Sequence, residues 1–194
     1  MQKELIILGA GESGIGAAIL AKKLNMPVFV TDFSEINTTC KTALNAHQIE
    51  WEENGHSTER ILKAQEIVKS PGVPDKAKIV QQARSQGISI ISEIEFASRH
   101  TPTRIIAITG SNGKTTTTML TNHLLQSAGI TTRMGGNIGY SFARLVAQEM
   151  EENLPKDAVY VLEISSFQLD DIQTFHPYIS MLLNITPEDR KSVV

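Results

Sequence analysis

The residues best suited to chemistry begin with a glycine-flanked turn, Gly110-Ser111-Asn112-Gly113-Lys114-Thr115, which follows an apolar run that ends at Ile108. Two glycines let backbone N–H groups approach an anion, and a helix that begins there presents its positive end. Lys114 adds a cation for phosphate, and Thr115 adds a hydroxyl for Mg²⁺. The general pattern has a glycine at the position of Ile108, so this turn is a variant. We interpret it as a phosphate-binding loop, with an ordinary helix start as the alternative.

A second glycine turn, Gly9-Ala10-Gly11-Glu12-Ser13-Gly14, follows a short apolar run and matches the pattern G-x-G-x-x-G. In the dinucleotide-binding fold the first glycine makes the turn, the second admits a phosphate, and an acid at the end of the next strand takes a ribose hydroxyl. Asp32, at the end of the apolar run 28–31, is the candidate acid. A turn that only packs a helix against a strand, with Asp32 solvated, is the alternative.

Two further candidates lie where a predicted strand ends. Ser70-Pro71-Gly72 follows the run 66–69, and ligands of open α/β sheets gather outside the carboxyl ends of strands. This turn is therefore a candidate second anion contact, although a plain turn is as good an interpretation. Glu163 follows the run 157–162, one strand away from the phosphate loop in a parallel sheet, where Mg²⁺ on Thr115 would need an anionic ligand. A solvated turn acid is the alternative for Glu163.

The elements that must position these residues alternate between strand and helix, which is typical of parallel α/β sheets. The strands are predicted at 5–8, 28–31, 49–51, 66–69, 88–91, 105–108, 130–134, 157–162 and 178–184. Helices are predicted after Gly14 and at 38–46, 57–64, 75–85, 93–99, 115–127 and 141–150, with Ser57 as a cap. The break at 100–103 predicts two domains. They are a Rossmann-like parallel-sheet domain over 1–100 and an incomplete P-loop ATPase α/β domain over 101–194.

Composition excludes several classes of protein. The chain has 194 residues, of which 41% are hydrophobic and 20% charged, as in soluble globular proteins with a real core. A net charge of −3 gives no reason to expect nucleic acid as a partner. No apolar run approaches the roughly 20 residues of a membrane span, and the N-terminus does not resemble a signal peptide. The single Cys40 excludes an internal disulfide and fits a reducing compartment.

Four blocks of the sequence resemble the Mur ligases of peptidoglycan synthesis, and they occur in that family's order. They are Thr109–Thr116, Gly135-Gly136-Asn137-Ile138-Gly139, Leu162–Leu169 and Leu183-Asn184-Ile185-Thr186-Pro187. The run Ser165-Ser166-Phe167-Gln168-Leu169 most resembles the branch that adds D-glutamate. The resemblance also explains Ile108, because the family's loop has the shorter form.

The resemblance implies an ATP-dependent amide ligation. ATP would phosphorylate the L-alanyl carboxylate of UDP-N-acetylmuramoyl-L-alanine, and the amine of D-glutamate would attack the acyl phosphate. By resemblance, Lys114 and Glu163 are the catalytic residues, and Thr115 and Glu163 hold Mg²⁺. ATP would lie on Gly110, Ser111, Asn112, Gly113, Lys114, Thr115, Thr116 and Thr117. The UDP substrate would contact Glu12, Ser13, Asp32, Phe33, Ser34, Ser70, Pro71, Gly72, Asn137, Ser165 and Gln168. We expect a bacterial cytoplasmic monomer with no membrane or nucleic-acid partner, although no sequence feature fixes the oligomeric state.

Two features depart from the family. Its aspartate-histidine pair is replaced here by Glu188-Asp189-Arg190, and the end at 191–194 resembles nothing in the family, whose chains continue through a carbamylated lysine and an amino-acid-binding domain. We therefore expect a fragment that cannot complete ligation alone. An NAD-dependent enzyme, supported by Gly9, Gly11, Gly14 and Asp32, and a catalytically dead nucleotide-binding module are the rival hypotheses. Family members that add L-alanine, a diamino acid or a dipeptide also stay open.

Overall fold

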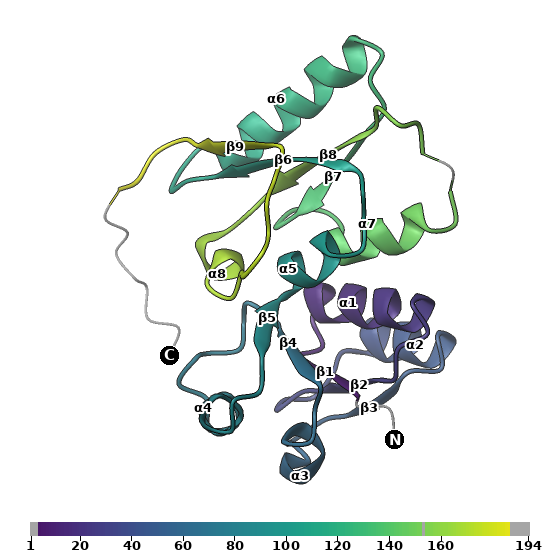
Figure 1. Cartoon of the computed structure of the whole chain (residues 1–194), viewed down its shortest axis with the longest axis vertical. Coiled ribbons are helices and arrows are strands. Elements are labelled where there is room, and N and C mark those ends of the chain that lie inside the picture. Colours follow the sequence, from purple (N-terminus) through teal and green to yellow (C-terminus); the bar gives the residue numbers. More distant parts are fainter. Residues whose placement is uncertain (1–3, 153, 187–194) are drawn as a thin grey trace.

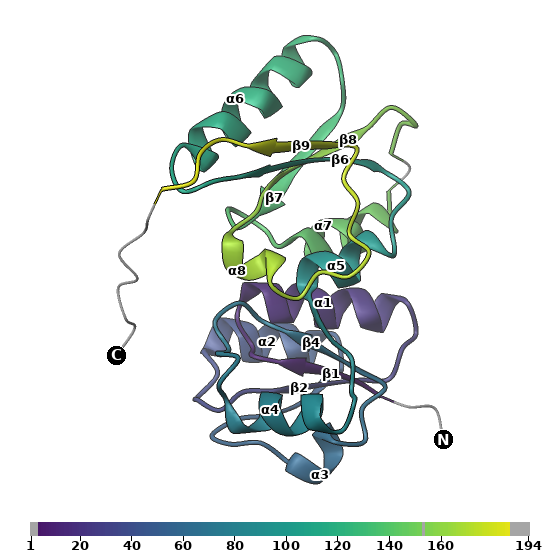
Figure 2. The same cartoon turned by 60° about the vertical axis from the view of Figure 1, so that its left-hand side comes forward.

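The chain folds into two parallel sheets, one above the other, with helices packed between them (Figure 1). The structure is a computed structural model and describes residues 4–152 and 154–186. Three of the helices, α1 (Glu12–Lys23), α5 (Glu93–Ser98) and α7 (Phe142–Glu149), contact one another between the sheets. Figure 2, turned by 60°, shows the same layering. The parallel α/β fold class predicted from the sequence is confirmed.

The first sheet has the strand order β3-β2-β1-β4-β5, which matches five of the six strands in the 3-2-1-4-5-6 order of a dinucleotide-binding fold. Its strands are β1 (Leu5–Leu8), β2 (Val28–Thr31), β3 (Glu50–Glu52), β4 (Glu66–Lys69) and β5 (Ile90–Ser92). Besides α1 and α5, its helices are α2 (Thr38–Ala46), α3 (Thr58–Ile61) and α4 (Lys78–Ser85). The apolar residues of β1 are buried on both faces, as in a central parallel strand.

The second sheet has the order β7-β8-β6-β9 and is also parallel throughout. Its strands are β6 (Arg104–Thr109), β7 (Thr132–Gly136), β8 (Val159–Glu163) and β9 (Ile179–Leu182). With α7, its helices are α6 (Lys114–Ser127) and α8 (Ser166–Leu169). Strand β8 lies directly beside β6, so the ends of both strands meet at one edge.

Three predictions about helices were wrong. Helix α3 ends at Ile61 instead of Ala64. Helix α4 begins at Lys78 instead of Asp75, because the chain first forms a turn in which the Ala77 N–H donates to the Pro74 oxygen at 2.9 Å. Ser57 does not cap α3 with its side chain, since its hydroxyl donates to Glu52 at 2.5 Å. The short α8 was not predicted.

One apolar core joins the two sheets. It contains Ile7 and Val30 from the first sheet, Ala107 and Leu162 from the second, and the facing sides of α1 and α7. The two helices approach so closely that a Cβ on Gly16 would lie 2.0 Å from Ser141 Oγ. The sheets are therefore held as one body by buried apolar surface.

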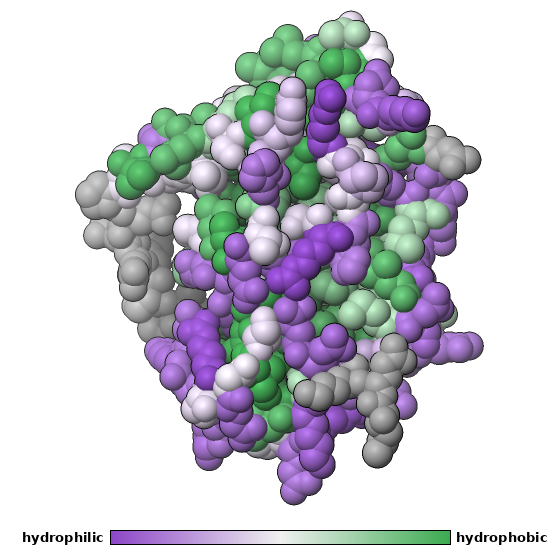
Figure 3. Space-filling view, in the orientation of Figure 1, coloured by the Kyte–Doolittle hydropathy of each residue, from purple (hydrophilic) through white to green (hydrophobic). Residues whose placement is uncertain are grey.

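The outer surface carries apolar side chains mainly on the second sheet. Met119, Leu120 and Leu124 are each more than half exposed on α6, and Leu182 is 61% exposed at the end of β9. Figure 3 shows apolar areas at the top and upper left of the molecule, and lower down it shows apolar areas interspersed with polar ones. In the described ranges, no helix has the length and apolarity needed to cross a membrane.

Candidate functional site

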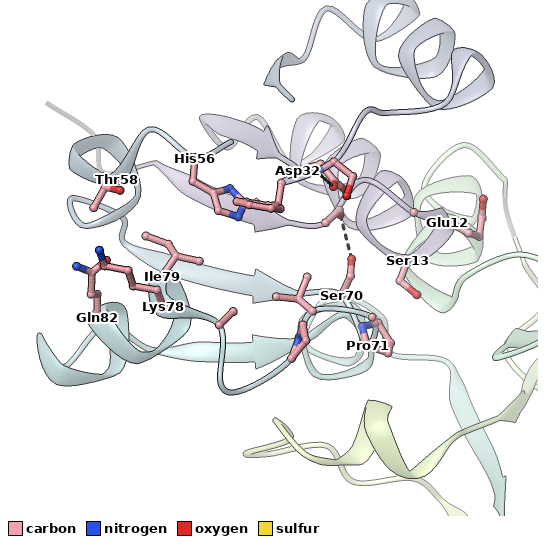
Figure 4. Close-up of a pocket in the computed structure, with 18 residues that line it drawn as sticks. Glu12, Ser13, Asp32, His56, Thr58, Ser70, Pro71, Lys78, Ile79 and Gln82 are labelled. Carbon is pink, nitrogen blue, oxygen red and sulfur yellow. Dashed lines mark hydrogen bonds between the residues drawn. The ribbon is translucent and has the colours of Figure 1, made fainter. Parts of the chain in front are cut away.

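A cleft of about 1170 Å³ opens along the carboxyl edge of the first sheet (Figure 4). The turns after β1, β2 and β4, the loop after β3, and α4 form its walls. Of the residues predicted to bind the UDP substrate, those that line it are Glu12, Ser13, Asp32, Phe33, Ser34, Ser70, Pro71 and Gly72. The structure thus brings into one cavity residues that are up to 60 positions apart in the sequence (72 minus 12).

The parallel register explains this convergence. Leu8, Thr31 and Lys69 end their strands side by side, so the turns that follow them leave the sheet at the same edge. Gly9 has a φ of +92°, which favours glycine, and a Cβ on Gly14 would lie 1.9 Å from the Gly9 oxygen. A Cβ on Gly11 would meet nothing within 4 Å. The turn is therefore tight at both ends and open to a ligand in the middle.

Asp32 and Ser70 hold the turn in place. One Asp32 oxygen accepts the Ala10 N–H at 2.8 Å, and the other accepts the Ser34 N–H at 2.9 Å. The Ser70 hydroxyl donates to the Gly9 oxygen at 3.0 Å. Since each carboxylate oxygen can accept more than one hydrogen bond, Asp32 can still accept from a ribose hydroxyl.

Glu12 takes part in a contact between the two sheets. Its carboxylate accepts the Ser141 N–H at 3.2 Å and pairs with Arg144 at 3.1 Å, both on or next to α7. Any ligand contact by the Glu12 side chain would compete with these partners. Its backbone, in the first turn of α1, remains suited to an anion.

The cleft also contains residues that the sequence analysis did not identify. They are His56, Thr58, Val73, Pro74, Ala77, Lys78, Ile79 and Gln82. His56 and Thr58 follow β3, whose end lies beside that of β2. The rule that ligands gather at carboxyl ends of parallel strands could have identified His56, had it been applied to this edge strand.

The phosphate-loop candidate connects β6 to α6. Gly110 and Gly113 have φ values of +142° and +84°, which explains the two glycines. The Lys114 ammonium donates to the Gly110 oxygen at 2.7 Å and the Ser111 oxygen at 3.0 Å, so its charge lies over the loop.

Asn184, beyond β9, fixes the tip of this loop, a role that the sequence analysis did not assign. Its side chain accepts the Asn112 N–H at 2.9 Å and donates to the Asn112 oxygen at 2.9 Å. The Ser111 N–H also donates to the Asn184 backbone oxygen at 3.0 Å. The loop is therefore held in shape by the end of the neighbouring strand.

Glu163 lies beside the loop, at the end of β8. It is 2% exposed, and its carboxylate accepts from the Thr115 hydroxyl at 2.6 Å and from the Asn137 amide at 2.8 Å. A hydroxyl beside a carboxylate is a hard oxygen donor pair of the kind that Mg²⁺ prefers. Within residues 4–152 and 154–186, no group of three or more His, Cys, Asp or Glu side chains is placed to hold a metal ion. The donor pair fits Mg²⁺ only if phosphate and water complete the coordination.

Ser165 and Gln168 form a capping box that begins α8. The Ser165 N–H donates to the Gln168 side chain at 3.0 Å, and the Gln168 N–H donates to the Ser165 hydroxyl at 3.4 Å. Like Asn137, which follows β7, these residues lie beyond the carboxyl ends of strands of the second sheet, and they are not among the residues that line the cleft. Their contact with a UDP substrate stays a prediction, and the substitution at 188–190 lies outside the described residues.

The fold and these sites define an α/β protein with two parallel sheets, each with a glycine turn of the nucleotide-binding type at its carboxyl edge. Residues 3–92 match the model of the Mur ligase MurD-like N-terminal domain, and residues 108–189 match that of the Mur ligase middle domain. The chain belongs to the Mur ligase family, as the sequence blocks predicted.

The chain is similar to curated relatives named UDP-N-acetylmuramoylalanine–D-glutamate ligase. It is 50% identical to that of Christiangramia forsetii over 97% of this chain and 41% of the relative. The identity to that of Bacteroides fragilis is 52%, over 96% of this chain and 40% of the relative. The chain thus spans about two fifths of the length of these relatives.

Two solved structures share the fold. One is the UDP-N-acetylmuramate:L-alanyl-gamma-D-glutamyl-meso-diaminopimelate ligase from Neisseria meningitides, with a TM-score of 0.60 and 20% identity, covering 97% of this chain and 62% of that chain. The other is the UDP-N-acetylmuramate-alanine ligase of Thermotoga maritima, with a TM-score of 0.57 and 18% identity, covering 96% of this chain and 42% of that chain. At these identities the likeness supports the fold alone.

Proposed function

We propose that this chain supplies the nucleotide-binding part of an ATP-dependent ligase that adds D-glutamate to UDP-N-acetylmuramoyl-L-alanine in peptidoglycan synthesis. The observation that carries the proposal is the cleft of the first sheet, where eight of the predicted UDP contacts lie together. The names of the relatives, which are about half identical in sequence, support the same substrates. We further propose that residues 1–100 form the UDP-binding domain and residues 101–194 part of the ATP-binding domain.

In this proposal the cleft anchors the uridine nucleotide. The diphosphate lies against the turn at Gly11 and the first turn of α1, where backbone N–H groups point outward. Asp32 accepts from the ribose, and Ser70 and Gly72 border the phosphates. These contacts bind the substrate far from its reacting end, so they serve to position it.

The loop at 110–117 holds ATP, with Lys114 on its phosphates. Thr115 and Glu163 would hold Mg²⁺, which when bound neutralises phosphate charge. The γ-phosphoryl group passes to the alanyl carboxylate, which gives ADP and an acyl phosphate. The amine of D-glutamate then attacks the carbonyl carbon, phosphate leaves, and an amide bond forms. A bacterial cytoplasmic location, a monomeric state and the lack of nucleic-acid or membrane partners remain predictions.

An NAD-dependent enzyme is the second candidate, because the same cleft has the glycine pattern and Asp32 of dinucleotide-binding proteins. That alternative does not explain the phosphate loop beside Glu163. The two candidates differ in the nucleotide that the cleft accepts.

Isothermal titration of UDP and of ATP with Mg²⁺ tests the two sites separately. Gly11→Val puts a branched side chain into open space in the cleft, at an ordinary φ of −77°, so we expect a folded variant that loses UDP and keeps ATP. Lys114→Ala should lose ATP and keep UDP. Each variant is the control for the other. The proposal is wrong if the wild-type chain binds neither nucleotide. It is also wrong if Gly11→Val leaves the affinity for UDP unchanged and Lys114→Ala leaves the affinity for ATP unchanged.

A further inference from the structure

The end of the cleft away from the glycine turn has no role in the proposed function. His56 lines it from the loop after β3, Thr58 lines it from the start of α3, and Lys78, Ile79 and Gln82 line it from α4 (Figure 4). If a nucleotide places its diphosphate at Gly11 and its ribose at Asp32, its base must lie in this end of the cleft. The inference below rests on the proposed function, because it assumes that orientation.

His56 is part of a short hydrogen-bonded chain with Thr31 and Glu52. The Thr31 hydroxyl lies 2.8 Å from a Glu52 carboxylate oxygen and 2.7 Å from His56 Nδ1. Glu52 also accepts the Ser57 N–H at 2.7 Å and the Ser57 hydroxyl. Burial acts to raise the pKa of Glu52, but the hydrogen bonds from Ser57 and Thr31 keep this pKa below its usual value. Glu52 is therefore an ionised group that can only accept.

The chain of contacts fixes the position of the ring proton on His56. Thr31 has one hydroxyl proton, and the carboxylate of Glu52 requires it. The oxygen of Thr31 can then only accept from His56, so Nδ1 carries the proton and Nε2 is left with a lone pair. Burial lowers the pKa of His56 despite the charges of Glu52 and Asp32, so the ring is neutral near pH 7. A neutral ring with this tautomer offers the cleft an acceptor.

We propose that His56 is a specificity-determining residue of the cleft, whose Nε2 accepts a hydrogen bond from the imide N–H of a uracil base. Cytosine has a lone pair at the corresponding ring nitrogen, so two acceptors would face each other. Phe33, whose ring centre lies 5.9 Å from that of His56 and which is 76% exposed, is placed to cover the base. The pair Thr31 and Glu52 acts on the base only through the tautomer of His56.

Isothermal titration of UDP and of CDP into the chain tests this proposal. UDP gains one hydrogen bond to His56, whereas CDP would place an acceptor against an acceptor. We therefore expect UDP to bind at least about tenfold more tightly than CDP. His56→Leu should reduce this ratio to about one. His47→Leu makes the same change at the end of α2, among residues that do not line the cleft, and should keep the ratio of the wild-type chain.

Two-bond ¹H–¹⁵N correlations of the wild-type imidazole provide a measurement that does not depend on a variant folding. We expect the Nδ1–H tautomer for His56, and the Nε2–H tautomer would overturn the proposal. Equal affinities for UDP and CDP would also overturn it while leaving the proposed function intact. If the wild-type chain binds neither UDP nor CDP, the proposed function fails and this inference fails with it.

Discussion

The carboxyl group of Glu93 should make the stability of this protein fall as pH rises toward neutrality. Glu93 begins α5 and is 1% exposed. One of its oxygens accepts the Ala143 N–H at the start of α7, and the other has no partner among the described residues. Burial raises the pKa of Glu93 from 4.5 to about 8, against the Ala143 hydrogen bond and with a small addition from the charge of Glu12. The folded chain therefore keeps a proton that the unfolded chain loses.

The magnitude follows from the difference between the two pKa values. Because the folded chain holds the proton more tightly, the free energy of unfolding decreases by about 1.4 kcal/mol per pH unit between 4.5 and about 8. At pH 7 the accumulated loss is about 3 kcal/mol. Glu93→Gln removes the titration and keeps an oxygen for the Ala143 N–H. Its stability relative to wild type should therefore grow by about 3 kcal/mol from pH 4.5 to pH 7.

Urea unfolding of both proteins at several pH values between 4.5 and 8 measures this difference. Glu95→Gln is the matched control, since Glu95 lies two positions along in α5 and is 0% exposed. Its carboxylate accepts the N–H groups of Gln173, Thr174 and Phe175, at 2.9, 2.8 and 2.7 Å.

Despite its burial, hydrogen bonds from Thr174, Gln173 and Arg99 lower the pKa of Glu95 to about 2. The stabilisation that ionised Glu95 provides is present above pH 4.5 and is lost as the pH falls toward 2. Glu95→Gln should therefore lower the free energy of unfolding by about 3 kcal/mol at pH 7. A difference between Glu93→Gln and wild type that does not change with pH would refute the reasoning on Glu93.

Two further predictions concern the packing of the sheets. Gly16→Ala should destabilise by about 1–3 kcal/mol, because its Cβ would meet Ser141 Oγ at 2.0 Å, and Ser141→Gly in the same chain should restore part of the loss in urea unfolding. An unchanged midpoint for Gly16→Ala would show that α1 and α7 are not in close contact. Lys69→Met should destabilise by about 3 kcal/mol, since Asp171, which Lys69 meets at 3.0 Å, is 8% exposed in its side chain and would keep Arg84 as its only ion-pair partner among the described residues. A double-mutant cycle with Asp171→Asn measures that coupling, and a coupling near zero would contradict the expectation.

Much of the fold could be predicted from local patterns. The bounds of β1, β2, β4 and α2 agree with the prediction, because the residues that form each of these elements lie within a few positions of one another in the sequence. The start of α4 could not be predicted in this way. Asp75 lies at the helix start expected from sequence, but its partners Lys69 and Arg84 are brought to it by the tertiary fold.

In the candidate site, too, local sequence patterns identify some residues, whereas others depend on contacts that the tertiary fold creates. Motif residues such as Gly11, Asp32 and Glu163 could be found because they lie at the ends of strong strands. His56 follows a strand of only three residues at the edge of the sheet, and its hydrogen bond to Thr31 joins positions 25 apart. The tautomer that this contact fixes cannot be inferred from the residue type alone.

Thermal unfolding with UDP-N-acetylmuramoyl-L-alanine, UDP and NAD at equal concentrations tests the central claim most directly, because a ligand that binds only the folded chain raises its midpoint. A ligand present at a hundredfold excess over its Kd adds about 2.7 kcal/mol to the free energy of unfolding. We predict that both uridine ligands raise the midpoint and that NAD leaves it unchanged. A rise with NAD and none with either uridine ligand would contradict the assignment of this cleft to a UDP-linked substrate.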